Sequence, residues 1–151
     1  MAKIFIYPTT SLILSDMVAR FGHEPLGAAL GIRERIQTAG FDSPPLQVTP
    51  EEPKKGLRWA AVEVPSGVRG RMAILGPLID QAEAAIIIND ADLAFGCMGC
   101  ARTNELLLFL LRHRGIPVLD LTYPKSEEEG EIFVAAIREF LEKLPKGGKA
   151  E

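Results

Sequence analysis

The sequence is poor in the residues that build metal centres and disulfide frameworks. Its 151 residues include only two cysteines and two histidines. A chain of this length can bury a continuous core without cross-links, and so few cysteines exclude a disulfide-rich scaffold. Only one Cys-x-x-Cys pair is present, so this chain alone cannot build a zinc ribbon, which needs two such pairs.

Long apolar runs and a strong charge of one sign are also absent. No run approaches the ~20 apolar residues that cross a bilayer, and residues 1–8 lack the layout of a signal peptide because proline interrupts the apolar residues. We therefore expect a cytoplasmic protein with no membrane partner. The formal net charge of -3 argues against a nucleic-acid partner, because phosphate binding needs clustered lysine and arginine.

Apolar runs and helical stripes alternate along the chain. Strands are predicted at residues 3–7, 59–64, 84–88 and 116–121, where apolar or β-branched runs are bounded by turn formers. Helices are predicted at residues 12–21, 26–39, 69–83 with an interruption at Gly76-Pro77, 103–114, and after the capping-box signature formed by Ser126 and Glu129. The proline-rich residues 42–56 predict a surface connection without regular structure.

Strands that alternate with helices predict an α/β fold. We expect a single three-layer domain over residues 1–145, with a mostly parallel four-stranded sheet of flavodoxin- or Rossmann-like type and a flexible tail at residues 146–151. In such sheets, ligands bind outside the carboxyl ends of the strands, where the strand order reverses. With the order 2-1-3-4, the loops at residues 7–11 and 89–103 face each other at that point.

The Gly-Cys-Met-Gly-Cys loop at residues 96–100 falls at this expected crevice and is the one concentrated chemical feature. Gly96 and Gly99 let the backbone turn tightly, so that Cys97 and Cys100 can direct both sulfurs to one place. Such a thiolate pair is a candidate ligand set for zinc or an iron–sulfur cluster, with glycine N–H groups donating to the sulfurs. The start of the following helix can lower the pKa of a thiol from ~8.5 to between ~3.5 and ~7.5.

Two cysteines leave a four-ligand site incomplete. We expect the missing ligands to come from another chain, either a second copy in a homodimer or a different subunit. His113 lies at the far end of its predicted helix and is interpreted as an exposed residue that favours the helix dipole. His23 follows the predicted helix end at Gly22 and is interpreted as a loop residue.

Several polar residues near the cysteines and elsewhere have two interpretations each. Arg102, Thr103 and Asn104 can bind an anion or orient a partner, while local capping explains Thr103 and Asn104 equally well. Asp90 and Asp92 can bind a hard cation, although acids at a strand end are usually solvated turn formers. Residues 66–71 carry two arginines near a helix start, which suits either an anion site or an ordinary turn.

Residues 3–8, 11–17, 21–25 and 95–106 together resemble the methanogenesis marker protein 5 family of archaea. The resemblance implies a cytoplasmic protein of methane-metabolising archaea that occurs alongside methyl-coenzyme M reductase, with a role in maturing or activating it and no assigned catalytic residue. The cysteine loop, its helix and the next strand are also similar to cluster-carrying units of 2-hydroxyacyl-CoA dehydratase components. Those units have more cysteines, which favours a shared or transient cluster here.

The leading hypothesis is therefore a non-enzymatic accessory protein of methanogenesis that holds or relays a metal or iron–sulfur group through Cys97 and Cys100. One alternative is a thiol–disulfide redox protein that uses the same pair. A further alternative is an interaction subunit within a hetero-complex, in which both thiols are buried and structural.

Overall fold

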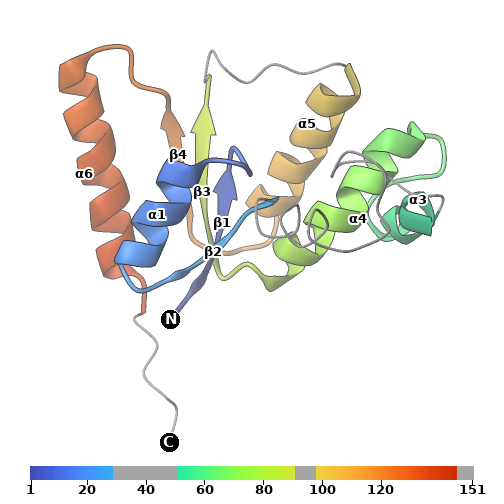
Figure 1. The fold of residues 1–151 in the computed structure, drawn as a ribbon, viewed down its shortest axis with the longest axis horizontal. Coiled ribbons are helices and arrows are strands. Elements are labelled where there is room, and N and C mark those ends of the chain that lie inside the picture. The colour runs from blue at the N-terminus through green and yellow to red at the C-terminus, as the bar shows by residue number, and fades with distance from the viewer. Residues whose placement is uncertain (29–50, 91–97, 146–151) are drawn as a thin grey trace, which may run out of the picture. The chain divides into compact units, whose positions relative to one another are not determined.

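The computed structural model describes residues 1–28, 51–90 and 98–145, which form an α/β fold around a four-stranded, all-parallel sheet (Figure 1). The strands are β1 (Lys3–Tyr7), β2 (Glu24–Leu26), β3 (Ala84–Asn89) and β4 (Val118–Thr122). Their order in the sheet is β2-β1-β3-β4. The predicted fold class, parallel sheet and 2-1-3-4 order are thus confirmed, although the second strand is a different segment from the one predicted.

Five α-helices and one short 3-10 helix lie in the described part of the chain. They are α1 (Leu12–Arg20), α3 (Glu51–Lys55), η1 (Gly56–Arg58), α4 (Ser66–Gln81), α5 (Met98–Arg112) and α6 (Glu127–Lys143). The chain divides into two compact units: residues 1–26, 82–95 and 115–151, and residues 27–81 and 96–114. The first unit holds the sheet with α1 and α6, and the second holds α3, η1, α4 and α5. No helix among the described residues is both long enough and apolar enough to cross a membrane.

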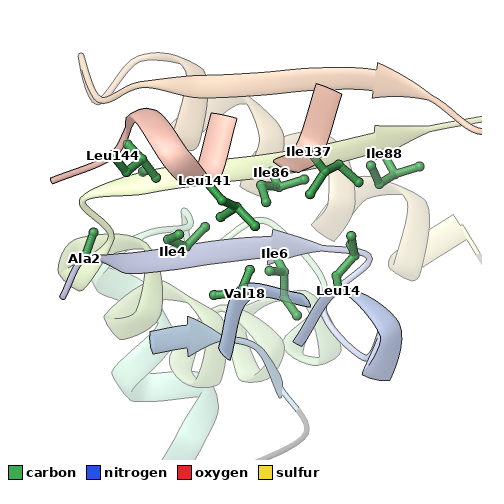
Figure 2. Close-up of a cluster of buried hydrophobic side chains, with 11 residues drawn as sticks. Ala2, Ile4, Ile6, Leu14, Val18, Ile86, Ile88, Ile137, Leu141 and Leu144 are labelled. Atoms are coloured by element: carbon green, nitrogen blue, oxygen red, sulfur yellow. The ribbon is translucent and has the colours of Figure 1, made fainter. Parts of the chain in front are cut away.

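The core of the first unit lies between the sheet and its two helices, α1 and α6 (Figure 2). It is a cluster of small and branched apolar side chains: Ala2, Ile4, Ile6, Leu14, Val18, Ala84, Ile86, Ile88, Ile137, Leu141 and Leu144. Alternate residues of β1 and β3 point to this face, as the two-residue period of a strand requires. Full burial of each large apolar side chain contributes about 1.5–3 kcal/mol, so this cluster holds both helices on the sheet.

Both helices of the first unit begin and end where the sequence predicts. The Ser11 hydroxyl accepts the N–H of Leu14 (3.3 Å) at the start of α1, and Gly22 ends that segment with a φ of 80°. The Ser126 hydroxyl accepts the N–H of Glu129 (3.2 Å) at the start of α6. These caps satisfy N–H groups that have no acceptor within the helix, which is why the residues at both starts are serines.

Four secondary-structure predictions are wrong at particular residues. No strand forms at residues 59–64, which the structure places in turns after η1, and β2 instead includes Leu26, where a helix was predicted to begin. The rest of that predicted helix, from residue 29 on, lies outside the described residues. The supposedly irregular residues 42–56 include the short helix α3. The predicted break at Gly76-Pro77 is absent, because α4 is continuous from Ser66 to Gln81.

Gly76 shows why α4 carries a glycine in its middle. A Cβ atom at this position would overlap the indole ring of Trp59, which lies against the helix. The tryptophan that suggested a strand is therefore a packing residue of the second unit, and its ring needs the bare backbone of Gly76. Pro77 follows within the helix, and its carbonyl accepts the side-chain amide of Gln81 (3.0 Å).

We expect Gly76→Ala to lower the free energy of unfolding by about 1–3 kcal/mol, because the methyl group must displace the Trp59 ring. Gly67→Ala is the matched control in the same helix, since a Cβ there meets nothing within 4 Å. That change should raise stability by up to about 1 kcal/mol through helix propensity. Urea unfolding measures both, and a Gly76→Ala protein as stable as Gly67→Ala would contradict the packing described.

Candidate functional site

The strand order places the switch point of the sheet between β1 and β3. The chain leaves β1 toward β2 on one side and leaves β3 toward β4 on the other, so the segments after β1 and β3 diverge there. In the described chain these segments are residues 8–11, which lead into α1, and Asn89 with Asp90 at the end of β3. The predicted ligand-binding edge of the sheet is thus formed by these residues.

Asn89 connects the carboxyl ends of β3 and β4. Its side-chain amide donates to the carboxylate of Asp120 and to the carbonyl of Leu121 (3.2 Å). Its own carbonyl accepts the N–H of Tyr123 (2.9 Å). This pair was not predicted from the sequence, although an asparagine and an aspartate on neighbouring strands were the available signal. These bonds hold the sheet edge from which the cysteine segment departs.

Asp90 has a φ of 53°, in the left-handed region that aspartate tolerates better than most residues. Its side chain is exposed, as expected for a turn former. Asp92, the other predicted cation ligand, lies outside the described residues. Among the residues that the structure describes, no three His, Cys, Asp or Glu residues are grouped to hold a metal ion.

The helix that follows the cysteine pair begins earlier than predicted. Helix α5 starts at Met98 and not near residue 103, so Gly99 and Cys100 belong to its first turn. Gly96 and Cys97 lie outside the described residues, and Cys97 directly precedes Met98 in the sequence. The backbone N–H groups of a first helical turn lack intrahelical acceptors and carry the positive end of the helix dipole. The motif therefore coincides with a helix start.

Arg102, Thr103 and Asn104 occupy the second turn of α5, so the predicted capping roles of Thr103 and Asn104 are wrong. Arg102 is exposed, Asn104 is half-buried, and Thr103 is only 1% exposed. Thr103 thus belongs to the buried stripe of α5 that includes Leu107 and Leu111. A binding role for these three residues stays a prediction.

The second predicted anion site, residues 66–71, lies at the start of α4 as expected. Ser66 and Gly67 are exposed, while Arg69 is half-buried. The Nε atom of Arg69 is buried and has no hydrogen-bond partner among the described residues. The backbone of Arg69 also packs against Gly56, where a Cβ atom would overlap the Arg69 carbonyl. Close packing of α4 with η1 therefore accounts for the burial of this arginine.

His113 lies just after α5, and its ring is exposed. Its Nδ1 donates to the carbonyl of Phe109 (2.8 Å), and the two rings lie 4.1 Å apart between centroids. The interpretation of His113 as an exposed residue at the helix end is confirmed. The position of His113 near the predicted end of its helix was enough to predict this exposure.

His23 is buried, and both of its ring nitrogens have backbone partners. Nδ1 accepts the N–H of Ala2 (3.3 Å), so the proton of the neutral ring lies on Nε2, which donates to the carbonyl of Leu141 (3.0 Å). The fourth residue after Leu141 is Pro145, which has no N–H to offer that carbonyl. His23 is therefore a structural bridge between the first strand and the end of α6.

Comparisons with known proteins agree with one another. Residues 2–144 match the family described as an uncharacterized protein conserved in archaea (DUF2112). The chain is also 60% identical over 144 residues to the uncharacterized protein MJ0404 of Methanocaldococcus jannaschii, in an alignment that covers 95% of this chain and 96% of that protein. No solved structure matches the chain. The similarity therefore extends across both compact units.

We expect His23→Ala to lower the free energy of unfolding by about 2–4 kcal/mol, because it leaves the buried Ala2 N–H and Leu141 carbonyl without partners. His113→Ala, at an exposed ring, is the matched control and should change it by no more than about 0.5 kcal/mol. Urea unfolding at neutral pH measures both variants. Equal effects of the two substitutions would contradict a bridging role for His23.

Proposed function

This chain belongs to that archaeal family, and from this premise we propose that it is an accessory protein of methane metabolism that holds or relays a metal or iron–sulfur group through Cys97 and Cys100. The observation that carries the proposal is the helix start at Met98, between the two cysteines. A Cys-x-x-Cys pair at a helix N-terminus has its two sulfur positions close in sequence and next to free N–H donors.

The helix start supports this chemistry electrostatically. Thiolates, not thiols, bind soft metal ions, and the positive end of a helix dipole stabilises a thiolate. Cys100 belongs to the first turn of α5, where this effect acts. The donor set of two thiolates fits zinc or an iron–sulfur group, both of which prefer sulfur ligands.

Two cysteines are half of a four-ligand site, and the histidines do not supply the other half. His23 already uses both ring nitrogens in backbone hydrogen bonds, and His113 follows the far end of α5. We therefore infer that a second copy of the chain or another subunit contributes the remaining ligands. Such shared ligation suits a protein that passes its cargo to a recipient.

The link to methanogenesis rests on the resemblance of residues 3–8, 11–17, 21–25 and 95–106 to the methanogenesis marker protein 5 family. The relative in Methanocaldococcus jannaschii and the archaeal distribution of the family support an archaeal role. In this proposal the protein is cytoplasmic and serves the maturation or activation of methyl-coenzyme M reductase.

A second candidate function uses the same two cysteines without a metal. A Cys-x-x-Cys pair at a helix N-terminus also suits thiol–disulfide exchange, in which one thiolate attacks a partner's disulfide and the other displaces it. The partner's disulfide is reduced to two thiols as Cys97 and Cys100 form a disulfide. The helix start at Met98 favours this candidate as well, so redox titration of the purified protein must accompany metal analysis.

We expect protein purified without oxygen from an archaeal host to contain zinc, or iron with acid-labile sulfide. Cys97→Ser and Cys100→Ser should each lower that content roughly tenfold or more, since even losing a residue that only supports a ligand costs 10–100-fold in affinity. Elemental analysis and an absorption spectrum measure this content. Met98→Leu, between the cysteines, is the matched control and should keep the metal.

Equal metal content in the wild type and both serine variants would contradict the metal-binding proposal. Metal-free wild-type protein with a reversible two-electron couple, lost in both variants, would establish the thiol–disulfide candidate in its place. If neither thiol of the folded, reduced and metal-free protein reacts with an alkylating reagent, both functions are excluded and the thiols are structural.

A further inference from the structure

Helix α5 is covered along one face and open along the opposite one. Thr103, Leu107 and Leu111 follow one another at intervals of four residues, and each is at most 1% exposed. Arg102 and Phe109 lie on the opposite side of the helix, and both are exposed. The burial of these side chains therefore follows the period of an α-helix.

The covered face extends toward the start of α5. Helix α4 packs against α5 within the second unit (Figure 1), and the buried residues of α4 include Met72, Leu75 and Ile79. Thr103 belongs to the second turn of α5 and is buried although threonine is polar and usually exposed. The face is thus closed one turn after the position of Cys100.

The helical period places position 100 on this covered face. Cys100 belongs to α5 and precedes Thr103, Leu107 and Leu111 by three, seven and eleven residues. Residues at these intervals lie on one side of an α-helix. The burial pattern of the described part of α5 therefore predicts an enclosed thiol at Cys100, an environment in which cysteine is often found.

Cys97 stands in a different relation to the helix. It precedes Met98, the first residue of α5, so the helical period that governs position 100 does not apply to it. Cys97 itself lies outside the described residues. The two cysteines are therefore not equivalent, and only Cys100 is tied to the covered face by the helix.

We infer that Cys100 is the enclosed thiol of the pair and that Cys97 is the thiol that meets a partner. The difference in accessibility rests on α5, whereas the part played by a partner rests on the proposed function. If the pair holds a metal, Cys97 is the ligand that a donor of the recipient protein replaces first. Cys100 then keeps its place until the transfer is complete.

The same assignment gives each cysteine a role in the thiol–disulfide candidate. The Cys97 thiolate attacks a disulfide of the partner, forms a mixed disulfide and releases one partner thiolate. The Cys100 thiolate then attacks the Cys97 sulfur and releases the second partner thiolate. Two electrons thus pass from the cysteine pair to the partner's disulfide, which is reduced while Cys97 and Cys100 become a disulfide.

The first test is alkylation of the reduced, metal-free, full-length protein with limiting iodoacetamide. Cyanogen bromide cleaves the chain after Met98, so Cys97 and Cys100 fall on different fragments, residues 73–98 and 99–151, which mass spectrometry compares. We expect Cys97 to react about tenfold faster or more, because an enclosed thiol reacts only after local opening of the fold. The same protein in concentrated urea is the control and should show nearly equal rates.

The second test uses single serine variants and a small aromatic disulfide reagent. Cys100→Ser keeps Cys97 and should react about tenfold faster than Cys97→Ser, which keeps only the enclosed thiol. Cys100→Ser should also hold a stable mixed disulfide, whereas the wild type should release two reagent thiolates per chain. Circular dichroism and urea unfolding show whether both variants are folded, and the wild-type alkylation does not depend on them.

The outcomes separate this inference from the proposed function. Equal rates at the two cysteines, or a faster reaction at Cys100, would overturn the inference and leave metal binding to its own test. Wild-type protein without metal that shows the expected order of rates would overturn the metal proposal and support the inference. If neither cysteine reacts, both are overturned.

Discussion

The burial of β3 is the constraint on which the rest of the structure depends. Its Ala-Ala-Ile-Ile-Ile run is apolar on both faces, so it can lie only inside a sheet with a strand on each side. Parallel neighbours cannot be joined by tight turns, and each must be reached through a crossover segment. Because β1 and β4 flank β3, the chain that leaves β3 starts at the switch point of the sheet. In the sequence the cysteine pair follows β3 after residues 90–96, so the chain leaves this buried strand before it reaches the proposed ligands.

A second constraint joins distant parts of the first unit. Pro145 ends α6 and leaves the Leu141 carbonyl without a donor from its own helix, and His23 supplies that donor. The same imidazole accepts the N–H of Ala2 beside β1. His23 is thus buried among apolar residues while both of its ring nitrogens keep hydrogen-bond partners. This assignment also removes His23 from the residues available to a metal ion, which strengthens the case for ligands from another chain.

Patterns along the chain predicted the elements that local rules determine. The run in β3, the serine caps of α1 and α6, and the glycine after α1 each follow from short-range chemistry, and the structure contains all of them. The sequence could not reveal β2, because its three residues include Pro25, which an edge strand tolerates and an interior strand does not. Nor could it show that Trp59 packs on Gly76. Aromatic residues favour strands, but packing against a helix can override that preference.

The proposed cysteine site and the burial of the α6 stripe differ in how much of each the sequence predicts. A Cys-x-x-Cys pair is visible as spacing, and the structure added only that α5 starts at Met98, inside the pair. The exposure of Ile132 has no motif, because it depends on α6 being anchored to the core by Ile137 and Leu141 in its C-terminal half. On the sequence alone, Ile132 belongs to the same helical stripe as the buried Ile137. The apolar stripe is wider than the surface that packs on the core, so Ile132 is exposed while Ile137 and Leu141 are buried. The apolar spacing therefore predicts the helix, while which of its apolar residues are buried depends on the sheet against which α6 packs.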